Sequence, residues 1–140
     1  QGFFIRVYVA RFGERSALFA GLVFGFVGFA SFGLAPTGYW FWAGIPVVAL
    51  WGLASAAILS LMSRRVSATE QGQLQGANAS VIGIANLIGP AIFSISYARA
   101  ISPEHGFGLP GTPFLLAAVF MVVALIVGIR VTRTQTQAGS

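Results

Sequence analysis

The chain alternates between long apolar stretches and short polar breaks. The four longest apolar stretches cover residues 16–34, 39–61, 75–101 and 114–131. Each is close to the ~20 residues that a helix needs to cross the hydrocarbon core of a bilayer. Two of the breaks, 35–38 and 102–113, contain turn-forming glycine and proline. The pattern predicts four membrane-spanning helices. The apolar residues 1–10 predict the end of a preceding helix, so we expect the chain to be a fragment.

The composition agrees with a membrane protein. Hydrophobic residues make up 56% of the 140 residues and charged residues only 8%, whereas a soluble domain has about 25% charged residues to cover its surface. We therefore expect an all-α, polytopic membrane helix bundle. The chain has no cysteine, which excludes disulfides and thiolate metal sites. The eight cations are all arginine and are scattered at the ends of the apolar stretches, so we expect no nucleic-acid binding.

The positions of the arginines predict an orientation in the membrane. Those that flank one side of the predicted helices are Arg11, Arg15, Arg64, Arg65, Arg130 and Arg133. The loops of the opposite side contain no arginine, and Arg99 is the exception to the pattern. Because cytoplasmic loops carry the excess of cations, residues 11–15, 62–74 and the tail 132–140 are expected in the cytoplasm. The aromatic run from Tyr39 to Trp42 then lies at the outer surface, either as an interfacial belt or as a stacking surface for an aromatic ligand.

The first cytoplasmic segment reads "RFGER" (residues 11–15). Gly13 permits a tight turn between two antiparallel helices. Arg11, Glu14 and Arg15 can pair with one another or with the ends of helices. A charged turn of this kind is also an ordinary determinant of membrane orientation, so it does not by itself indicate a function.

Three segments together resemble a known family. The segments "QGFF…VARFGERSAL" (1–18), "SRRVSATEQGQLQGA" (63–77) and "IGPAIFSISYA" (88–98) are similar to the C-terminal half of the major facilitator superfamily, and more closely to its tetracycline-efflux and multidrug proton-antiporter branch. The resemblance implies a fragment of a twelve-helix fold, in which the four apolar stretches are helices nine to twelve and residues 1–10 end helix eight. It also implies that "RFGER" is the copy of a loop motif in the first half, which makes Arg11, Gly13, Glu14 and Arg15 candidates for conformational gating.

The function implied by this resemblance is secondary transport. A full-length relative is a monomer in the bacterial inner membrane that exports small, hydrophobic drugs in exchange for protons through alternating access. Its partners are the lipid bilayer, a small-molecule substrate and protons. We expect no enzyme activity, cofactor or metal site, because one histidine and three scattered glutamates offer no metal triad or carboxylate pair. The alternatives are a transporter of another small solute and a stand-alone four-span scaffold or subunit.

The third apolar stretch carries amides that suggest a substrate cavity. Gln75 and Asn86 are eleven residues apart and share a helix face, and Asn78 lies about 60° away from Gln75. Polar side chains in a span usually face protein or water, and the resemblance implies that helices ten and eleven line the cavity. These three amides, with Trp51 of the second stretch, are therefore the cavity candidates. For Asn86, a hydrogen bond to another helix is an equal alternative.

The same stretch contains small residues and a proline. The small residues allow close contact with other helices; they are Gly76, Ala79, Ser80, Gly83 and Gly89. Pro90 removes one backbone hydrogen bond and can kink the helix. Gly89 and Pro90 are therefore further gating candidates, although a static kink explains them equally well.

Two positions depart from the family pattern. Gly25 stands where tetracycline exporters look acidic, and Arg6 stands where they have a small glycine. None of the four predicted spans contains an aspartate or glutamate. A proton carrier needs an ionisable group in the cavity, so that group is expected in a part of the protein upstream of this chain.

Overall fold

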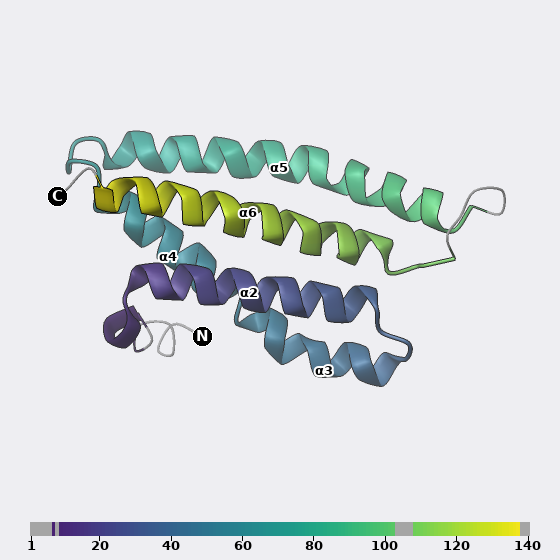
Figure 1. The fold of residues 1–140 in the computed structure, drawn as a ribbon. Helices are drawn as coiled ribbons and strands as arrows, with labels where there is room; N and C mark the ends of the chain where they lie inside the picture. Colours follow the sequence, from purple (N-terminus) through teal and green to yellow (C-terminus); the bar gives the residue numbers. More distant parts are fainter. Residues whose placement is uncertain (1–6, 8, 103–107, 138–140) are drawn as a thin grey trace.

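The computed structural model describes residues 7, 9–102 and 108–137, and within these ranges the chain forms helices and turns but no strands. The helices are α2 (Glu14–Gly33), α3 (Gly38–Ala49), α4 (Gly52–Ser63), α5 (Gln71–Ala100) and α6 (Thr112–Gln137), as Figure 1 shows. Four segments are long and apolar enough to cross a membrane: α2, α3 together with α4, α5, and α6 up to Val131. The predicted all-α, polytopic class is confirmed. Most of the predicted helix end at residues 1–10, including Arg6, lies outside the described residues.

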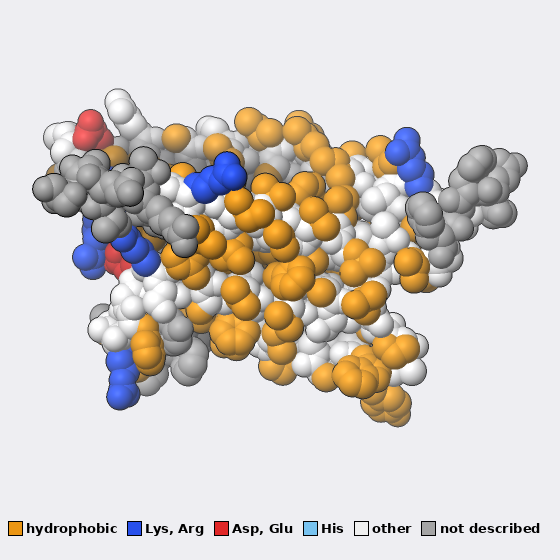
Figure 2. Space-filling model, in the orientation of Figure 1, with side chains coloured by type: hydrophobic (Ala, Val, Ile, Leu, Met, Phe, Trp, Pro, Cys, Tyr) orange, Lys and Arg blue, Asp and Glu red, His pale blue; other side chains and the backbone are white. Residues whose placement is uncertain are grey.

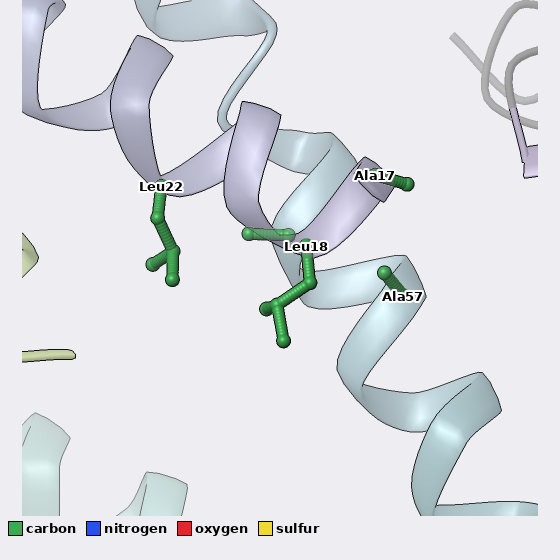
Figure 3. Close-up of a cluster of buried hydrophobic side chains, with 5 residues drawn as sticks. Ala17, Leu18, Leu22 and Ala57 are labelled. Carbon is green, nitrogen blue, oxygen red and sulfur yellow. The ribbon is translucent and has the colours of Figure 1, made fainter. Parts of the chain in front are cut away.

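Helix α2 is the centre of the described fold, because it packs against α6, α4 and α3. A cluster of buried side chains joins it to α4: Ala17, Leu18, Leu22, Ala54 and Ala57. Figure 3 shows Leu18 and Leu22 pointing to the same side of α2, with Ala57 on the helix that crosses it. The α4 side of the cluster consists of alanines, so the two helices can approach closely.

Glycines on α2 make this close packing possible. A Cβ atom built on Gly21 would lie 2.8 Å from the Cβ atom of Ala54 and 2.9 Å from its Cα atom. A Cβ atom on Gly28 would collide in the same way with Val48 of α3, and one on Gly33 with Leu115 of α6. Small residues at successive turns of α2 therefore let three neighbours contact its backbone.

The close packing expected at the small residues of α5 has no partner within the described chain. A Cβ atom added to Gly76, Gly83 or Gly89 of α5 would meet nothing within 4 Å in the described chain. The pattern of small residues alone could not separate the two helices, because small-xxx-small spacing occurs in both. The glycines of α2 carry the same signal, at positions 21, 25 and 28.

The second predicted span is not one helix. Residues Leu50 and Trp51 form a turn between α3 and α4, although the two helices follow one another along the same course in Figure 1. Around the turn each backbone N–H bonds to the carbonyl three residues before it, as in the pairs Trp51 to Val48 at 2.9 Å and Ala54 to Trp51 at 2.9 Å. Pro46, inside α3, has no N–H to donate to the preceding turn. The predicted span over 39–61 is present as a segment of membrane-spanning length, but its interruption was not predicted because this local tightening does not change hydropathy.

Helix α5 lies alongside α6 but contacts the rest of the fold sparingly. Only Ala100 is buried in it, and every residue from 79 to 88 is exposed. It begins at Gln71, four residues before the predicted start, and continues through Pro90 without interruption. Helix α6 continues to Gln137, so the predicted tail 132–140 begins as a continuation of this helix.

Candidate functional site

The amides of α5 do not converge on one enclosed site. The residues of α5 that are at least partly shielded lie on one face of the helix: Gln71, Leu74, Asn78, Gly89, Phe93, Ser96 and Ala100. Asn78 belongs to this face, which packs towards α6 and α4. Gln75 and Asn86 are exposed at its edge. Because α5 is continuous, Gln75 and Asn86 share a helix face as predicted. We call the three cavity candidates Gln75, Asn78 and Asn86 the amide strip.

An unpredicted amide, Gln71, anchors the start of this helix. Its side-chain Nε2 donates a hydrogen bond of 3.1 Å to the carbonyl of Ser63 at the end of α4. Beside it, Ser67 and Glu70 close the turn that precedes α5. The Ser67 hydroxyl (2.7 Å) and backbone N–H (3.0 Å) both donate to the Glu70 carboxylate and lower the pKa of Glu70 below its ordinary value.

The gating candidates Gly89 and Pro90 lie in the second half of α5. Gly89 is half-buried and Pro90 is exposed, and the helix is continuous on both sides of them. A Cβ atom built on Gly89 would meet nothing within 4 Å in the described chain, so packing within this chain does not require a glycine there. Their role as gating residues stays a prediction.

Trp51 lies at the break between α3 and α4, against the glycine face of α2. Its indole meets Phe29 edge to face, with ring centroids 5.6 Å apart and planes at 70°. A Cβ atom on Gly25 would lie 3.0 Å from Trp51 Cδ1 and 3.2 Å from Met121 Sδ. Glycine at position 25 therefore leaves the room that the indole occupies, and a side chain there would crowd Trp51 and Met121.

Trp51 lines a pocket of about 460 Å³ that α2, α5 and α6 complete. Its described lining is entirely apolar: Phe29, Trp51, Phe93, Pro113, Phe114, Ala117, Phe120 and Met121. We call this the aromatic pocket. Of the four cavity candidates, only Trp51 lines it. The phenylalanines of α2, α5 and α6 were missed by the sequence analysis, because isolated phenylalanines in apolar spans carry no distinguishing pattern.

The loop candidates lie at the end of the molecule where arginines gather, as Figure 2 shows. Gly13 has a positive φ of 82°, which glycine adopts without strain, as the predicted turn requires. Glu14 is the first residue of α2, and its side chain is only 12% exposed. The side chains of Arg11 and Arg15 are exposed.

Glu14 pairs across the fold rather than within its own loop. Its Oε1 atom lies 2.9 Å from Arg64 Nε and accepts a hydrogen bond from the Ser60 hydroxyl. Both partners belong to the end of α4, so this group, the Glu14–Arg64 tie, fixes the start of α2 to α4. Of the expected partners of Glu14, namely Arg11, Arg15 and helix ends, the structure gives it the ends of helices: Glu14 lies in the first turn of α2 and pairs with Arg64 at the end of α4.

The aromatic run at the other end divides into two parts. Tyr39, Trp40 and Trp42 are 88%, 64% and 74% exposed, as an interfacial belt requires. Phe41 instead stacks on Phe32 of α2, with ring centroids 4.2 Å apart. The run is thus partly a packing element, in addition to the predicted belt.

No family model matches the chain, and no solved structure matches it. Several curated proteins are distantly similar. The tetracycline resistance protein, class C, of Escherichia coli is 31% identical over 76% of this chain. The class G protein of Vibrio anguillarum is 27% identical over 76% of it, and the human Hippocampus abundant transcript 1 protein is 27% identical over 84%. The chain spans 27% or 28% of the length of these relatives. The chain thus has four helices of membrane-spanning length and is distantly similar to tetracycline resistance and Hippocampus abundant transcript proteins.

Proposed function

We propose that this chain belongs to a secondary transporter that exports small hydrophobic drugs in exchange for protons. The observation that carries the proposal is the 31% identity to the tetracycline resistance protein, class C, over 76% of the chain. The similarity to a protein of Escherichia coli favours the bacterial inner membrane. A cytoplasmic C-terminus is favoured because the described arginines other than Arg99 gather at the end where α2 starts and α6 finishes.

The described helices contribute two features to this proposal. The amide strip on α5 offers hydrogen-bonding groups on a helix that has few contacts within this chain, so it is available to substrate or to another part of the transporter. The Glu14–Arg64 tie keeps α2 and α4 together at the arginine-rich end, as a rigid body in a rocking mechanism requires.

Replacing Asn86 tests the amide strip. In the natural protein, expressed in a drug-sensitive bacterium, Asn86→Ala should reduce drug export several-fold, because it removes a hydrogen-bond donor and an acceptor from the amide strip. Alanine favours the helix, so the change should not disrupt α5. The measurement is resistance and efflux rate for a panel of hydrophobic drugs, at equal amounts of protein in the membrane.

Ser80→Ala is the matched control. Ser80 is also exposed on α5, but its hydroxyl bonds only within the helix, to the carbonyl of Gly76 at 2.9 Å. It lies on another side of the helix from Gln75, about 140° away. Unchanged export of every drug by Asn86→Ala would remove Asn86 from the substrate path.

Transport of a different small solute is the second candidate. It is favoured by the similarity to Hippocampus abundant transcript proteins, which extends over 84% to 99% of the chain and whose names specify no drug. Absence of resistance to all drugs tested, from a protein that is present in the membrane, would favour this second candidate over export of drugs.

A further inference from the structure

The aromatic pocket has a chemistry that selects its occupant. Rings or ring edges from separate helices border it: Phe29, Trp51, Phe93, Phe114 and Phe120. Trp51 and Phe120 remain 39% and 46% exposed, so their surfaces are not consumed by packing. The volume of about 460 Å³ lies within the ~300–1,000 Å³ of small-molecule sites.

Apolar surface alone would not draw a ligand into this pocket. Within a bilayer, lipid tails are as apolar as the lining, so transfer from lipid to the pocket gains little hydrophobic free energy. The pocket differs from lipid in that its aromatic rings can make edge-to-face or offset contacts with another ring, at centroid distances of about 4.5–7 Å. An acyl chain cannot use those contacts, but a planar aromatic molecule can.

The lack of charged side chains in the described lining restricts the occupant to uncharged molecules. The described lining has no charged or hydrogen-bonding side chain beyond the indole N–H of Trp51, and an ionised group placed there would lose its solvation without a partner. Neighbouring contacts also hold the rings in place. Phe29 braces Trp51 edge-on, and Phe114 is held edge-on by Phe32 and Phe41 at 5.6 and 5.8 Å.

We propose that the aromatic pocket is a binding site for a neutral, planar aromatic molecule. The glycine at position 25 and the break before α4 create it, because together they place the Trp51 ring over α2 beside Met121. That the bound molecule is a transported drug rests on the function proposed above, whereas the binding itself does not.

Photolabelling tests the site in the natural full-length protein, reconstituted in phosphatidylcholine vesicles. A neutral phenyl diazirine is photolysed in the presence of increasing naphthalene or dodecane, and labelled peptides are identified by mass spectrometry. Labelling of the segments around Phe93 and Met121 should be saturable and suppressed by naphthalene. Dodecane at the same membrane concentration should suppress it much less. Equal suppression by both, or non-saturable labelling, would assign the pocket to lipid chains, and absence of labelling would mean that another part of the protein fills it; each of these results overturns the proposal.

Variants separate the pocket from the rest of the lipid-facing surface. Ala117→Trp should fill the pocket and weaken the saturable labelling about tenfold or more. Val119→Trp is the control, since Val119 is 56% exposed and points away from Ala117, about 160° around α6. Phe120→Leu keeps the site apolar but removes one ring, and should weaken labelling by about threefold to tenfold. Retention of wild-type affinity by Ala117→Trp and Phe120→Leu would overturn the assignment.

The readout separates this inference from the transport proposal. Saturable labelling by a protein that exports nothing would preserve the site and defeat the exporter. Drug export without saturable labelling would preserve the exporter and defeat the site.

Discussion

At the scale of single residues, the closest packing in this protein depends on the absence of side chains. Gly21 and Gly76 are both helical glycines in predicted membrane spans, and nothing in their immediate sequence distinguishes them. Only Gly21 faces another helix, where the backbone of Ala54 occupies the space that a Cβ atom would need. The two positions should therefore respond oppositely to the same substitution.

Gly21→Ala should destabilise the protein, by about 1–3 kcal/mol, because overpacking forces the backbones of α2 and α4 apart. Gly76→Ala should leave stability unchanged or raise it by up to about 1 kcal/mol, because its Cβ atom meets no neighbour and alanine favours the helix. Thermal or denaturant unfolding in detergent micelles measures both. Equal responses of the two variants would show that α2 and α4 do not approach as described.

At the scale of elements, polar contacts fix the relative positions of helices, which the burial of apolar side chains alone does not determine. The Glu14–Arg64 tie connects α2 to α4, and the bond from Gln71 to Ser63 connects α4 to α5. Both contacts lie at the arginine-rich end of the bundle. Since α5 has few other contacts with α4, such links determine where it enters the membrane relative to its neighbours.

Arg64→Gln should lower stability by about 1 kcal/mol. The Arg64 side chain is 75% exposed, which places the pair near the weak, surface class of ion pairs, and high salt should shrink the difference. Arg15→Gln, the same change at an exposed arginine of the same end, is the control and should cost less.

A double-mutant cycle with Glu14→Gln isolates the pairwise energy from other effects of removing each charge. The same detergent unfolding experiment at low and high salt supplies the four stabilities. A coupling energy of zero, at low salt, would mean that the contact between Glu14 and Arg64 does not hold the helices together.

At the scale of the whole molecule, the arrangement of charge and of apolar surface predicts a single orientation. The chain contains no native cysteine, so single cysteines can report it if the rest of the protein is also made cysteine-free. Ser67→Cys, between α4 and α5, should react with a membrane-impermeant maleimide only from the cytoplasmic side. Leu109→Cys, before α6, should react only from the outside. The reverse pattern of reactivity would overturn the proposed topology.

Much of the architecture was predictable because it depends on local free energies. Each apolar stretch is long enough to span a bilayer whatever its neighbours are, so the four membrane segments could be located to within a few residues. The turn at Gly13 also follows from a local residue preference. The break at Leu50 and Trp51 was missed, because Pro46 is tolerated in membrane helices and need not interrupt one.

The sequence by itself determined the class of this protein, the number and position of its membrane segments, and the shared helix face of Gln75 and Asn86. Only the tertiary structure decided which glycines contact a neighbour, that Glu14 pairs with Arg64, and that Trp51 completes an aromatic pocket with α5 and α6. The physical reason is that a bilayer makes every span similarly apolar, so hydropathy fixes where helices form but carries almost no information about which of their faces meet.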